Sequence, residues 1–527
     1  MTLLQDINTD PKSPLVINVL RIDPKAPRLR LACTLANDGI IESDATKGRE
    51  TVSAMVARKR ALAGVNADYF PYTGDPLGLA VMGGELVSEP MDRVALGITA
   101  PGDVLLDKVG FTATVVAPSG AAAKLHGLNR PRGKNELILY TPVYGSSTDT
   151  KDGVELSLDL SGPIRANSDV VATATAAPGP IVPSPIPRDQ AVLSAHGTAA
   201  DWLSANVHKG DKLTLRFDIK ADSGTSWDNV MEAVGGGPWL LRNGKPRIDN
   251  AAENLPLGFD TTRHPRTAAG VTASGELLLV TVDGRQTISQ GMTLPELAEL
   301  MKSLGTVDAI NLDGGGSTTL SIRGLVINSP CEGKERPVAD ALLIYGTPVP
   351  QAAVAFRFAE SGPVAATSGD GRMLGLIDEV TGQPVCDETA NAVLWGTTGG
   401  IEFVNQKGYF TPIKVGKGSV VALLGDQRIE LPVAIVPGSP AKLVAKLASD
   451  PSGAPNRSQV DVKLVDLNGN GIPGKLVTVS TTGGVLDSPT AATDGTGAAT
   501  FGVTWDSTPA LGRATVSAAG LTALASR

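Results

Sequence analysis

The sequence predicts an α+β catalytic domain, built of mixed β-sheets with a few helices, followed by one or two all-β sandwich domains. Its 527 residues exceed what one ordinary hydrophobic core organises, so two to four domains are expected. With 60 Gly, 37 Pro and only 19% charged residues, the chain favours turns and short strands over long helices. Aromatic residues are few (4%), so Val, Ala, Thr and Leu supply most core side chains, which is typical of β-rich proteins.

The composition also limits the classes of partner. The formal net charge is −8 and no Lys/Arg-rich run occurs, so no nucleic-acid partner is expected, although one or two arginines can hold a small phosphate-bearing ligand. No run of 18 or more apolar residues exists, so no membrane span is predicted. Cys33, Cys331 and Cys386 lie far apart without CxxC spacing and predict neither a disulfide framework nor a zinc site. No cofactor is predicted, and no pattern specifies an oligomeric state.

Residues 1–346 are predicted to form the catalytic domain from short strands and two helices. Residues 277–282 (LLLVTV) are a clear strand, because they form a short apolar run between turn-forming residues. The first helix is expected over residues 51–62, with Thr51 or Ser53 as its N-cap.

The second helix has the clearer boundaries. The segment Thr293-Leu294-Pro295-Glu296 combines a capping box with a proline in the first turn. Leu and Met side chains then recur at helical spacing, and Gly305 ends the helix. A strand over residues 307–311 follows, so the helix and the strand together carry Asp313 to a strand end, a common place for a functional site.

The rest of the chain is predicted to contain a loop, a linker and two smaller β-rich domains. Residues 172–188 are rich in Ala and Pro and are expected to form a surface loop of the catalytic domain. Residues 347–350 form a linker to a small β-rich domain over residues 351–438. Residues 441–527 alternate apolar and polar side chains between turns, which is typical of a β-sandwich.

One segment of this last region imitates a calcium-binding loop. Asp466-x-Asn468-x-Asn470-Gly471 matches the start of an EF-hand loop, but its twelfth position is Val477 instead of the bidentate Glu. A tight turn is therefore predicted there.

The densest group of chemically active side chains is NLDGGGSTT, residues 311–319. An apolar strand runs into amide, carboxylate, glycine and hydroxyl groups. Glycines let the backbone approach a ligand and turn several N–H groups to one side, forming an anion-binding nest. A glycine-rich turn capped by the Asp accounts for the same letters, so the neighbouring motifs decide. The candidates are Asn311, Asp313, Gly314, Gly315, Gly316, Ser317 and Thr318.

Five other segments supply similar chemistry. Residues 65–70 end a strand with two polar side chains beside two aromatic rings, which suits a sugar. Residues 234–240 are a second glycine-rich strand end, and residues 264–270 place an Arg among small side chains. Residues 283–285 and 335–340 each pair a carboxylate with an Arg. The candidate catalytic residues among these are Arg266 and Asp283, and the candidate substrate-binding residues are Asn66, Asp68, Tyr69, Phe70, Gly236, Gly237, His264, Thr267 and Arg336.

Together these segments resemble the phosphodiester glycosidase family over roughly residues 60–345, about half of the chain. Asp68 and Asp340 depart from the pattern of the animal members. The resemblance implies a glycoside hydrolase that cleaves a sugar-1-phosphodiester, for example GlcNAc-α-1-phospho-mannose, to free sugar and phosphomonoester. The matching phrases are Asn66-x-x-Tyr69-Phe70, Gly237-x-Trp239-Leu240-x-Arg242-Asn243-Gly244, Arg266-Thr267-Ala268-x-Gly270, Asp283-Gly284 and Ala309-Ile310-Asn311-Leu312-Asp313-Gly314-Gly315-Gly316-Ser317.

The resemblance implies roles for individual residues. A phosphate monoester is an acidic leaving group, so it needs its charge held more than it needs a general acid. Arg266 and Arg336 are assigned to the phosphate, with help from the nest at residues 314–316. Asp313 is the first choice for nucleophile or base at the anomeric carbon, and Asp283 is the second.

The remaining roles concern the sugar. Asn66 and Asn311 are expected to bind its hydroxyls or to orient the carboxylates. Tyr69, Phe70 and Trp239 are expected to form a stacking wall.

Two other functions are compatible with the same residues. A divalent metal such as calcium on Asp68, Asp283, Asp313 and Asp340 would make the protein a metal-dependent phosphodiesterase that attacks phosphorus. A non-catalytic glycan-binding adhesin on the cell surface would also use the terminal sandwich. EDTA sensitivity, the site of ¹⁸O incorporation and turnover itself distinguish the three.

The terminal segment, residues 441–527, resembles the bacterial immunoglobulin-like domains of the invasin and intimin type. Such modules space or display a partner domain outside the cell, so a secreted or cell-surface location is predicted. The N-terminus, Met-Thr-Leu-Leu-Gln-Asp, lacks the basic and apolar regions of a signal peptide, which is therefore expected to have been removed from this sequence.

Overall fold

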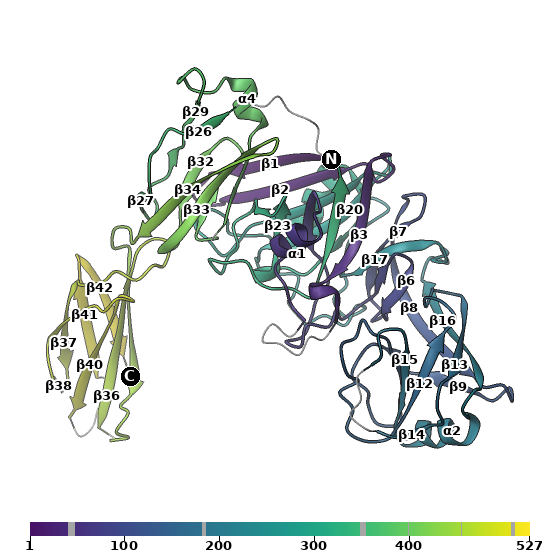
Figure 1. The fold of residues 1–527 in the computed structure, drawn as a ribbon. Coiled ribbons are helices and arrows are strands. Elements are labelled where there is room, and N and C mark those ends of the chain that lie inside the picture. Colours follow the sequence, from purple (N-terminus) through teal and green to yellow (C-terminus); the bar gives the residue numbers. More distant parts are fainter. Residues whose placement is uncertain are drawn as a thin grey trace. The chain divides into compact units, whose positions relative to one another are not determined.

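Short strands joined by turns dominate the structure, so the predicted mainly β character is confirmed (Figure 1). The computed structural model describes residues 1–40, 48–181, 186–347, 355–398, 400–454, 456–506 and 512–526. The chain divides into two units, Met1–Pro350 and Gln351–Arg527, which are described separately.

The first sheet of the N-terminal unit carries the segments around Arg266, Asp283 and Asp313. Its strands pair antiparallel in the order β1-β2-β21-β20-β22-β18-β19. Their bounds are β1 Thr2–Asn8, β2 Leu15–Ile22, β18 Trp239–Arg242, β19 Lys245–Pro246, β20 Arg266–Thr272, β21 Leu277–Val282 and β22 Thr306–Asn311.

Helix α3 (Leu294–Ser303) covers this sheet, as the sequence predicted. The Thr293 hydroxyl accepts from the Glu296 N–H, and the Glu296 carboxylate accepts from the Thr293 N–H, which completes the capping box. The apolar face of α3 is buried with Leu278 and Val280 of the sheet. Each fully buried Leu or Met stabilises the fold by roughly 1.5–3 kcal/mol. This packing holds β22, and with it Asp313, in place.

A second, larger sheet contributes the strand that ends at Gly235. Its order is β10-β11-β15-β12-β13-β16-β8-β7-β17-β5-β6, with β14 on β12 and β9 on β8, and helix α2 (Thr198–Asn206) packs at its core. The bounds are β5 Ala80–Met82, β6 Glu85–Ser88, β7 Val94–Thr99, β8 Val104–Val116, β9 Ala122–Leu125, β10 Gly127–Leu128, β11 Leu137–Tyr140, β12 Val154–Leu160, β13 Asp169–Ala174, β14 Gly179–Pro180, β15 Ala191–Ala195, β16 Lys212–Ala221 and β17 Val230–Gly235.

The loop predicted over residues 172–188 needs correction. Residues 172–174 complete strand β13, which pairs with β12 and β16, and residues 179–180 form β14. The Ala-rich composition suggested a loop, but these small side chains pair within a sheet. Residues 182–185 of the predicted loop and 348–350 of the predicted linker lie outside the described residues.

The third sheet of this unit contains β24-β23-β4-β25-β3, covered by helix α1 (Val52–Arg58). Thr51 is the N-cap, and its hydroxyl accepts from the Ala54 N–H at 3.3 Å. Helix α1 ends before the predicted residue 62. The bounds are β3 Leu29–Leu35, β4 Ala63–Asn66, β23 Leu320–Ile322, β24 Leu325–Val326 and β25 Asp340–Gly346, and two short 3₁₀ helices span η1 Ala36–Asp38 and η2 Gly315–Ser317.

The C-terminal unit is also built of β-strands. Residues 356–436 contain the sheet β27-β34-β33-β30, the pair β26-β29, the sheet β28-β32-β31 and helix α4 (Asp387–Ala392) around one core. Their bounds are β26 Phe356–Phe358, β27 Val364–Thr367, β28 Arg372–Met373, β29 Leu376–Asp378, β30 Leu394–Thr397, β31 Glu402–Val404, β32 Tyr409–Pro412, β33 Gly416–Leu424 and β34 Gln427–Val436.

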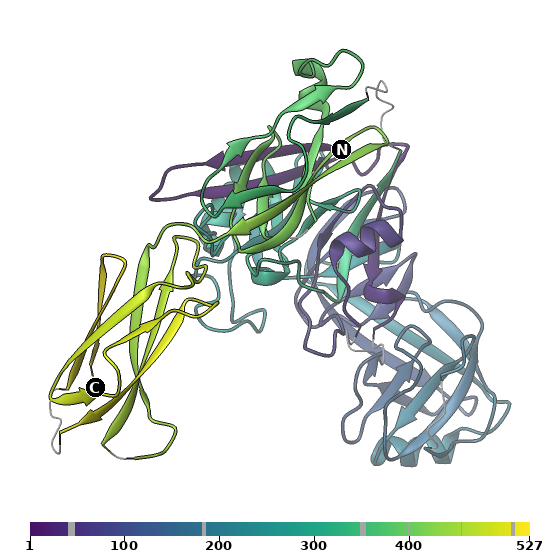
Figure 2. The same cartoon turned by 60° about the vertical axis from the view of Figure 1, so that its left-hand side comes forward.

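Residues 442–526 form a sandwich of two four-stranded sheets, visible at the yellow end of the chain in Figure 2. Their orders are β35-β36-β40-β38 and β39-β37-β41-β42, and apolar side chains from both sheets share a core. The bounds are β35 Lys442–Ser449, β36 Arg457–Val465, β37 Leu476–Thr482, β38 Gly484–Leu486, β39 Thr490–Ala492, β40 Ala498–Trp505, β41 Arg513–Ala518 and β42 Leu521–Ser526.

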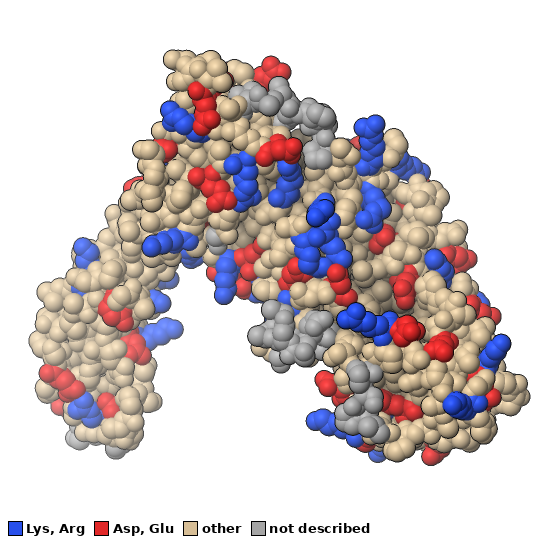
Figure 3. All heavy atoms as spheres, viewed as in Figure 1, with Lys and Arg blue, Asp and Glu red and all other residues tan. Residues whose placement is uncertain are grey.

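Neither surface charge nor helix length is extreme. On the face drawn in Figure 3, Lys and Arg side chains are interspersed with Asp and Glu side chains. Within the part of the chain that the structure describes, every helix is too short or too polar to cross a membrane.

Candidate active site

The predicted site lies where strand ends of the three N-terminal sheets meet. Asn66 ends β4, Asn311 ends β22 and Gly235 ends β17. The Asp313 N–H donates to the Ala67 carbonyl at 2.8 Å, and the Gly237 N–H donates to the Asn311 carbonyl at 2.7 Å. These bonds join segments that are far apart in sequence.

Asp313 is the most accessible carboxylate of this junction. It is half-buried, at the start of the turn that leads into η2. Burial raises the pKa of its carboxyl to about 6, while the Ser317 hydroxyl, the Gly314 N–H and the charge of Arg336 oppose the rise. Asp313 is therefore an anion above about pH 6 and faces a cation, which suits a nucleophile or a base.

Most backbone N–H groups of the anion-binding nest predicted at residues 314–316 already donate to acceptors within the protein. The Gly314 N–H donates to the Asp313 carboxylate at 2.8 Å, and the Gly315 N–H donates to the Pro265 carbonyl at 2.9 Å. The Ser317 N–H is also used, within the turn. The sequence showed the glycines but not that the loop satisfies its own donors.

Two further carboxylates lie buried behind Asp313. Asp340 accepts from the Asp68 N–H at 2.9 Å, and its second carboxylate oxygen has no partner among the described residues. The Asp68 carboxylate accepts from the Gly78 N–H at 2.5 Å and lies so close to Gly235 that a Cβ there would be 2.4 Å from it. Burial, together with the charge of Asp313, raises the pKa of Asp68 to about 7, although the N–H groups of Gly78 and Tyr69 oppose the rise. Burial and the charges of Asp68 and Asp313 raise the pKa of Asp340 well above its usual value.

Asn66 ties the Asp313 loop to the neighbouring strands. Its amide donates to the Asp313 carbonyl at 2.6 Å. Its carbonyl oxygen accepts from the Thr267 hydroxyl at 2.8 Å and from the Thr319 N–H at 3.0 Å. Both Asn66 and Thr267 are fully buried, so they position the loop and do not line an open sugar site.

Asn311 holds the Tyr69 hydroxyl. Its amide donates to that hydroxyl at 2.7 Å and to the Gly237 carbonyl at 3.0 Å, and the Tyr69 hydroxyl donates to the same carbonyl at 2.6 Å. The side-chain oxygen of Asn311 is buried without a partner among the described residues. Tyr69 is half-buried, and its contact with a sugar stays a prediction.

Asp283 does not join the other carboxylates. It is fully buried, and its two oxygens accept from the Asn328 amide and the Ser329 N–H, each at 2.9 Å. Burial raises its pKa to about 7. Asp283 therefore holds the start of the 328–329 segment in place, and its catalytic role stays a prediction.

Arg266 is likewise committed to the fold. Only 2% of its surface is exposed. Its guanidinium donates to the carbonyl of Met292 at 3.0 Å, of Thr262 at 2.8 Å and of Phe259 at 3.2 Å. These carbonyl partners argue against the predicted contact with phosphate.

The cations that do reach the turn are Arg285 and Arg336. Arg285 is exposed, with Nε and NH2 at 3.2 and 3.0 Å from Nδ1 of His264. Arg336 NH1 lies 3.5 Å from the Ser317 hydroxyl, and its guanidinium is ion-paired with Glu332. The sequence drew attention to Arg285 only as a neighbour of Asp283, so its part in this group was missed.

The remaining predicted residues are peripheral. Phe70 packs against the cluster under α1, away from the predicted sugar wall. Trp239 is 5% exposed with Arg242 stacked over it, which also removes it from such a wall. Gly236 packs against the Asn311 backbone, and Thr318 is buried.

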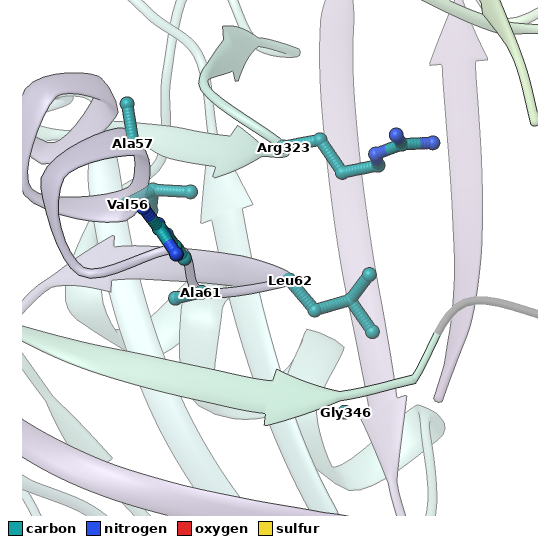
Figure 4. Close-up of a pocket in the computed structure, with 7 residues that line it drawn as sticks. Val56, Ala57, Ala61, Leu62, Arg323 and Gly346 are labelled. Carbon is teal, nitrogen blue, oxygen red and sulfur yellow. The ribbon is translucent and has the colours of Figure 1, made fainter. Parts of the chain in front are cut away.

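Trp239 lines a cavity of about 380 Å³ together with Arg242 and Asp308. Figure 4 shows one of about 270 Å³ between α1, Leu62, Arg323 and the end of β25. Among the described residues, no group of three or more His, Cys, Asp or Glu side chains is placed to hold a metal ion. Asp283 in particular is too committed to Asn328 and Ser329 to complete the metal set considered from the sequence.

The site thus combines a partly exposed carboxylate, Asp313, with the nearby charge of Arg336 in a mainly β protein. Residues 163–345, which include Asp313, Arg285 and Arg336, match the model of the family described as phosphodiester glycosidase. Over 111 residues the chain is 35% identical to N-acetylglucosamine-1-phosphodiester alpha-N-acetylglucosaminidase of Mus musculus, covering 19% of this chain and 21% of that protein.

Two further similarities extend this finding. The chain is 39% identical over 108 residues to the SPbeta prophage-derived uncharacterized protein YomE of Bacillus subtilis (strain 168), covering 20% of this chain and 16% of that protein. A solved structure from Burkholderia pseudomallei K96243, of a protein whose name predicts export, superposes with a TM-score of 0.51 at 27% identity and covers 63% of this chain and 74% of that chain. The resemblance to the phosphodiester glycosidase family is thereby confirmed, although the chain spans only about a fifth of the length of the mouse enzyme.

Proposed function

We propose that this chain is a glycoside hydrolase that cleaves a sugar-1-phosphodiester to free sugar and phosphomonoester. The observation that carries the proposal is the position of Asp313, a half-buried carboxylate beside Arg336 within the family match at 163–345. The name of the mouse relative supports an N-acetylglucosamine-1-phosphodiester as the substrate class, and GlcNAc-α-1-phospho-mannose is proposed as the model substrate.

The chemistry follows from the leaving group. When the bond between the sugar C1 and the phosphate oxygen breaks, its electron pair stays on that oxygen and the product is a phosphomonoester. This product is a stable anion, so cations at the site lower the barrier more than a proton donor does. Asp313, ionised above about pH 6, either attacks C1 or activates a water that does.

The buried pair Asp68 and Asp340 sets the electrostatic background of this step. Asp313 raises the pKa of both, so the three carboxylates repel one another. Asp68 and Asp340 therefore hold protons at a pH where the more exposed Asp313 has lost its own. This division leaves one anion at the position nearest to the cations.

The sugar is proposed to lie against Tyr69. Its ring is half-buried, and its hydroxyl is fixed by Asn311 and the Gly237 carbonyl. The unpartnered side-chain oxygen of Asn311 is an acceptor for a sugar hydroxyl or for a water that bridges to one.

The regions that follow the catalytic domain are proposed to display it outside the cell. We assign residues 1–346 to catalysis, residues 351–438 to a small β-rich domain and residues 441–527 to an immunoglobulin-like module. An exported or surface-bound enzyme is supported by the sandwich at 442–526 and by the predicted export of the Burkholderia protein.

The test uses GlcNAc-α-1-phospho-methyl-mannoside with the protein and with Asp313→Asn. Asp308→Asn is the matched control, because Asp308 lies on the same strand and its carboxylate accepts from the Asn243 N–H, away from the turn. Release of GlcNAc and mannose phosphate, retained in the control and lost in Asp313→Asn, is expected. In H₂¹⁸O the label should enter the sugar C1.

Two outcomes would overturn the proposal. Release of GlcNAc-1-phosphate with ¹⁸O in phosphate, abolished by EDTA, identifies a metal-dependent phosphodiesterase instead. Tight glycan binding with no turnover of any glycosyl phosphodiester identifies an adhesin.

A further inference from the structure

We infer that Arg285 and Arg336, and not Arg266, form the anion-binding site of this chain, with His264 as the residue that positions Arg285. That the anion is the phosphate of a sugar phosphodiester rests on the proposed function. The anion site itself is carried by four observations on these side chains.

Arg285 lies directly over the turn that follows Asp313. A Cβ built on Gly315 would be 3.2 Å from NH2 and 3.4 Å from NH1 of Arg285, so the guanidinium covers this glycine. Its backbone has φ +58°, in the left-handed region, just beyond the end of β21.

The partner of Arg285 leaves its charge uncompensated. Its Nε and NH2 meet Nδ1 of His264, at 3.2 and 3.0 Å. Burial and the neighbouring charges of Arg285 and Arg266 lower the pKa of His264, so the ring is neutral and its Nδ1 accepts. Among the described residues no carboxylate pairs with Arg285, whereas an acidic partner would cancel its attraction for an anion.

Arg336 contacts the same turn from a segment that follows it in the sequence. Its NH1 is 3.5 Å from the Ser317 hydroxyl, and a Cβ on Gly316 would be 2.2 Å from its NH2. The absence of side chains at Gly315 and Gly316 therefore leaves room for the two guanidinium groups against the backbone. This requirement explains the glycines better than a backbone nest does, since the N–H groups of the nest are largely used.

The two guanidinium groups converge. Both lie close enough to the Cys331 thiol to oppose the rise that burial causes in its pKa. Arg336 also lowers the pKa of Asp313. An anion bridging Arg285 and Arg336 would thus lie beside Asp313, which places a sugar C1 attached to it within reach of the carboxylate.

Glu332 competes for this site in the absence of ligand. It is paired with Arg336, and both side chains are more than a third exposed, at 38% and 35%. Exposed pairs of this kind hold weakly, so an anion that contacts both arginines can displace Glu332. Removing Glu332 should therefore strengthen anion binding.

The test measures binding of inorganic phosphate by isothermal titration calorimetry at low ionic strength, without turnover. Arg285→Gln and Arg336→Gln are each expected to weaken phosphate binding about tenfold or more, because each removes charge-assisted hydrogen bonds. Glu332→Gln is expected to strengthen it severalfold. Arg263→Gln is the matched control, since Arg263 pairs with Glu296 and the Gly291 carbonyl and should leave binding unchanged.

His264 is tested by its effect on Arg285. His264→Phe removes the acceptor, so phosphate binding should weaken, and Arg285→Gln added to it should cost much less than in the wild-type background. Additive losses would instead show that His264 does not act through Arg285.

Unchanged phosphate affinity in both arginine variants, or no phosphate binding by the wild-type protein, overturns the inference. Phosphate binding that follows the expected pattern in a protein that hydrolyses no glycosyl phosphodiester would overturn the proposed function and leave the anion site standing. The two failures are therefore distinguishable.

Discussion

Glu402 of the C-terminal unit is a buried carboxylate whose replacement should stabilise the protein. Its side chain is fully buried, and neither oxygen has a hydrogen-bond partner among the described residues. The carboxylate lies against Gly418, where a Cβ would be 2.6 Å from both oxygens. Burial raises its pKa from 4.5 to about 7, and the backbone N–H groups of Ser419 and of Glu402 itself moderate the rise without completing a hydrogen bond.

The magnitude and its sign follow from this pKa. The folded state binds the proton more tightly than the unfolded state, so ionisation of Glu402 costs nothing below pH 4.5, costs progressively more between pH 4.5 and 7, and costs a constant amount above pH 7. A rise from 4.5 to about 7, at 1.36 kcal/mol for each pKa unit, corresponds to about 3 kcal/mol. Glu402→Gln should recover part of this above pH 7, because its amide N–H groups also need partners, and Glu402→Met should recover more.

The assay is hydrogen exchange of the peptides that cover β31–β33, followed by mass spectrometry at pH 5 and pH 8. Slower exchange in both variants at pH 8, with a smaller effect at pH 5, is expected after correction for the intrinsic exchange rate. Glu379→Gln, an exposed residue of the same unit, should change protection by less than about 0.5 kcal/mol. A gain that is equal at the two pH values, or a loss at pH 8, would refute the reasoning.

Three further predictions concern the N-terminal unit. The kcat/KM for a glycosyl phosphodiester should rise with pH, with a midpoint near pH 6, where Asp313 ionises. Arg336→Gln should move this midpoint to higher pH, because the charge of Arg336 lowers the pKa of Asp313. A midpoint that this substitution does not move would contradict the assignment. Asn66→Ala removes three buried hydrogen bonds, so it should lower the free energy of unfolding, measured by urea titration, by about 2–4 kcal/mol and should also reduce activity. An unaltered urea midpoint would show that these hydrogen bonds are not formed. Thr293→Ala removes the N-cap of α3 and should lower the melting temperature, at a cost of about 1 kcal/mol, while Thr293→Ser should not.

The features that the sequence predicted well are those determined by neighbours in the chain. The capping box of α3 needs only Thr293 and Glu296, three residues apart, and it formed as expected. The placement of Asp313 at a strand end likewise follows from the helix and strand that precede it. The tight turn expected at Asp466 is present, because the Asp466 carboxylate accepts from the N–H groups of Asn468 and Asn470, at 2.9 and 2.8 Å.

The hydrogen-bond partners of Arg266 and Asp283 lie far away in the sequence and could not be predicted from it. Arg266 is an isolated cation in its own segment, and nothing local reveals that the carbonyl of Met292, 26 residues later, accepts from it. Asp283 is bound by Asn328, 45 residues later. A charged side chain in a glycine-rich motif is therefore available for binding or catalysis only when the fold leaves some of its hydrogen-bonding groups free. The sequence of one segment cannot show whether they are free.

This criterion reassigns the cations of the site. Arg266 is almost fully buried, and its Nε and Nη2 donate to the carbonyls of Met292, Thr262 and Phe259, so these hydrogen bonds all go to the backbone. Arg285 contacts the neutral ring of His264 and the Cys331 thiol, and the ion-pair partner of Arg336 is the exposed Glu332, which a ligand can displace. Because an anion is attracted most strongly where positive charge is least compensated, Arg285 and Arg336 are the stronger attractors, although only Arg336 was a candidate from the sequence.

The loop of residues 466–470, which imitates the start of a calcium-binding loop, makes hydrogen bonds to the preceding β-rich region. Its Asn470 amide donates to the Ser368 hydroxyl at 2.9 Å and to the Ile413 carbonyl at 2.7 Å, and the Asn470 side-chain oxygen accepts from the Val415 N–H at 3.0 Å. These bonds connect the terminal sandwich with residues 356–436, and they use the Asn470 side-chain oxygen, the atom that a cation would otherwise bind. The polar residues that imitate a metal loop thus supply hydrogen bonds between two β-rich regions.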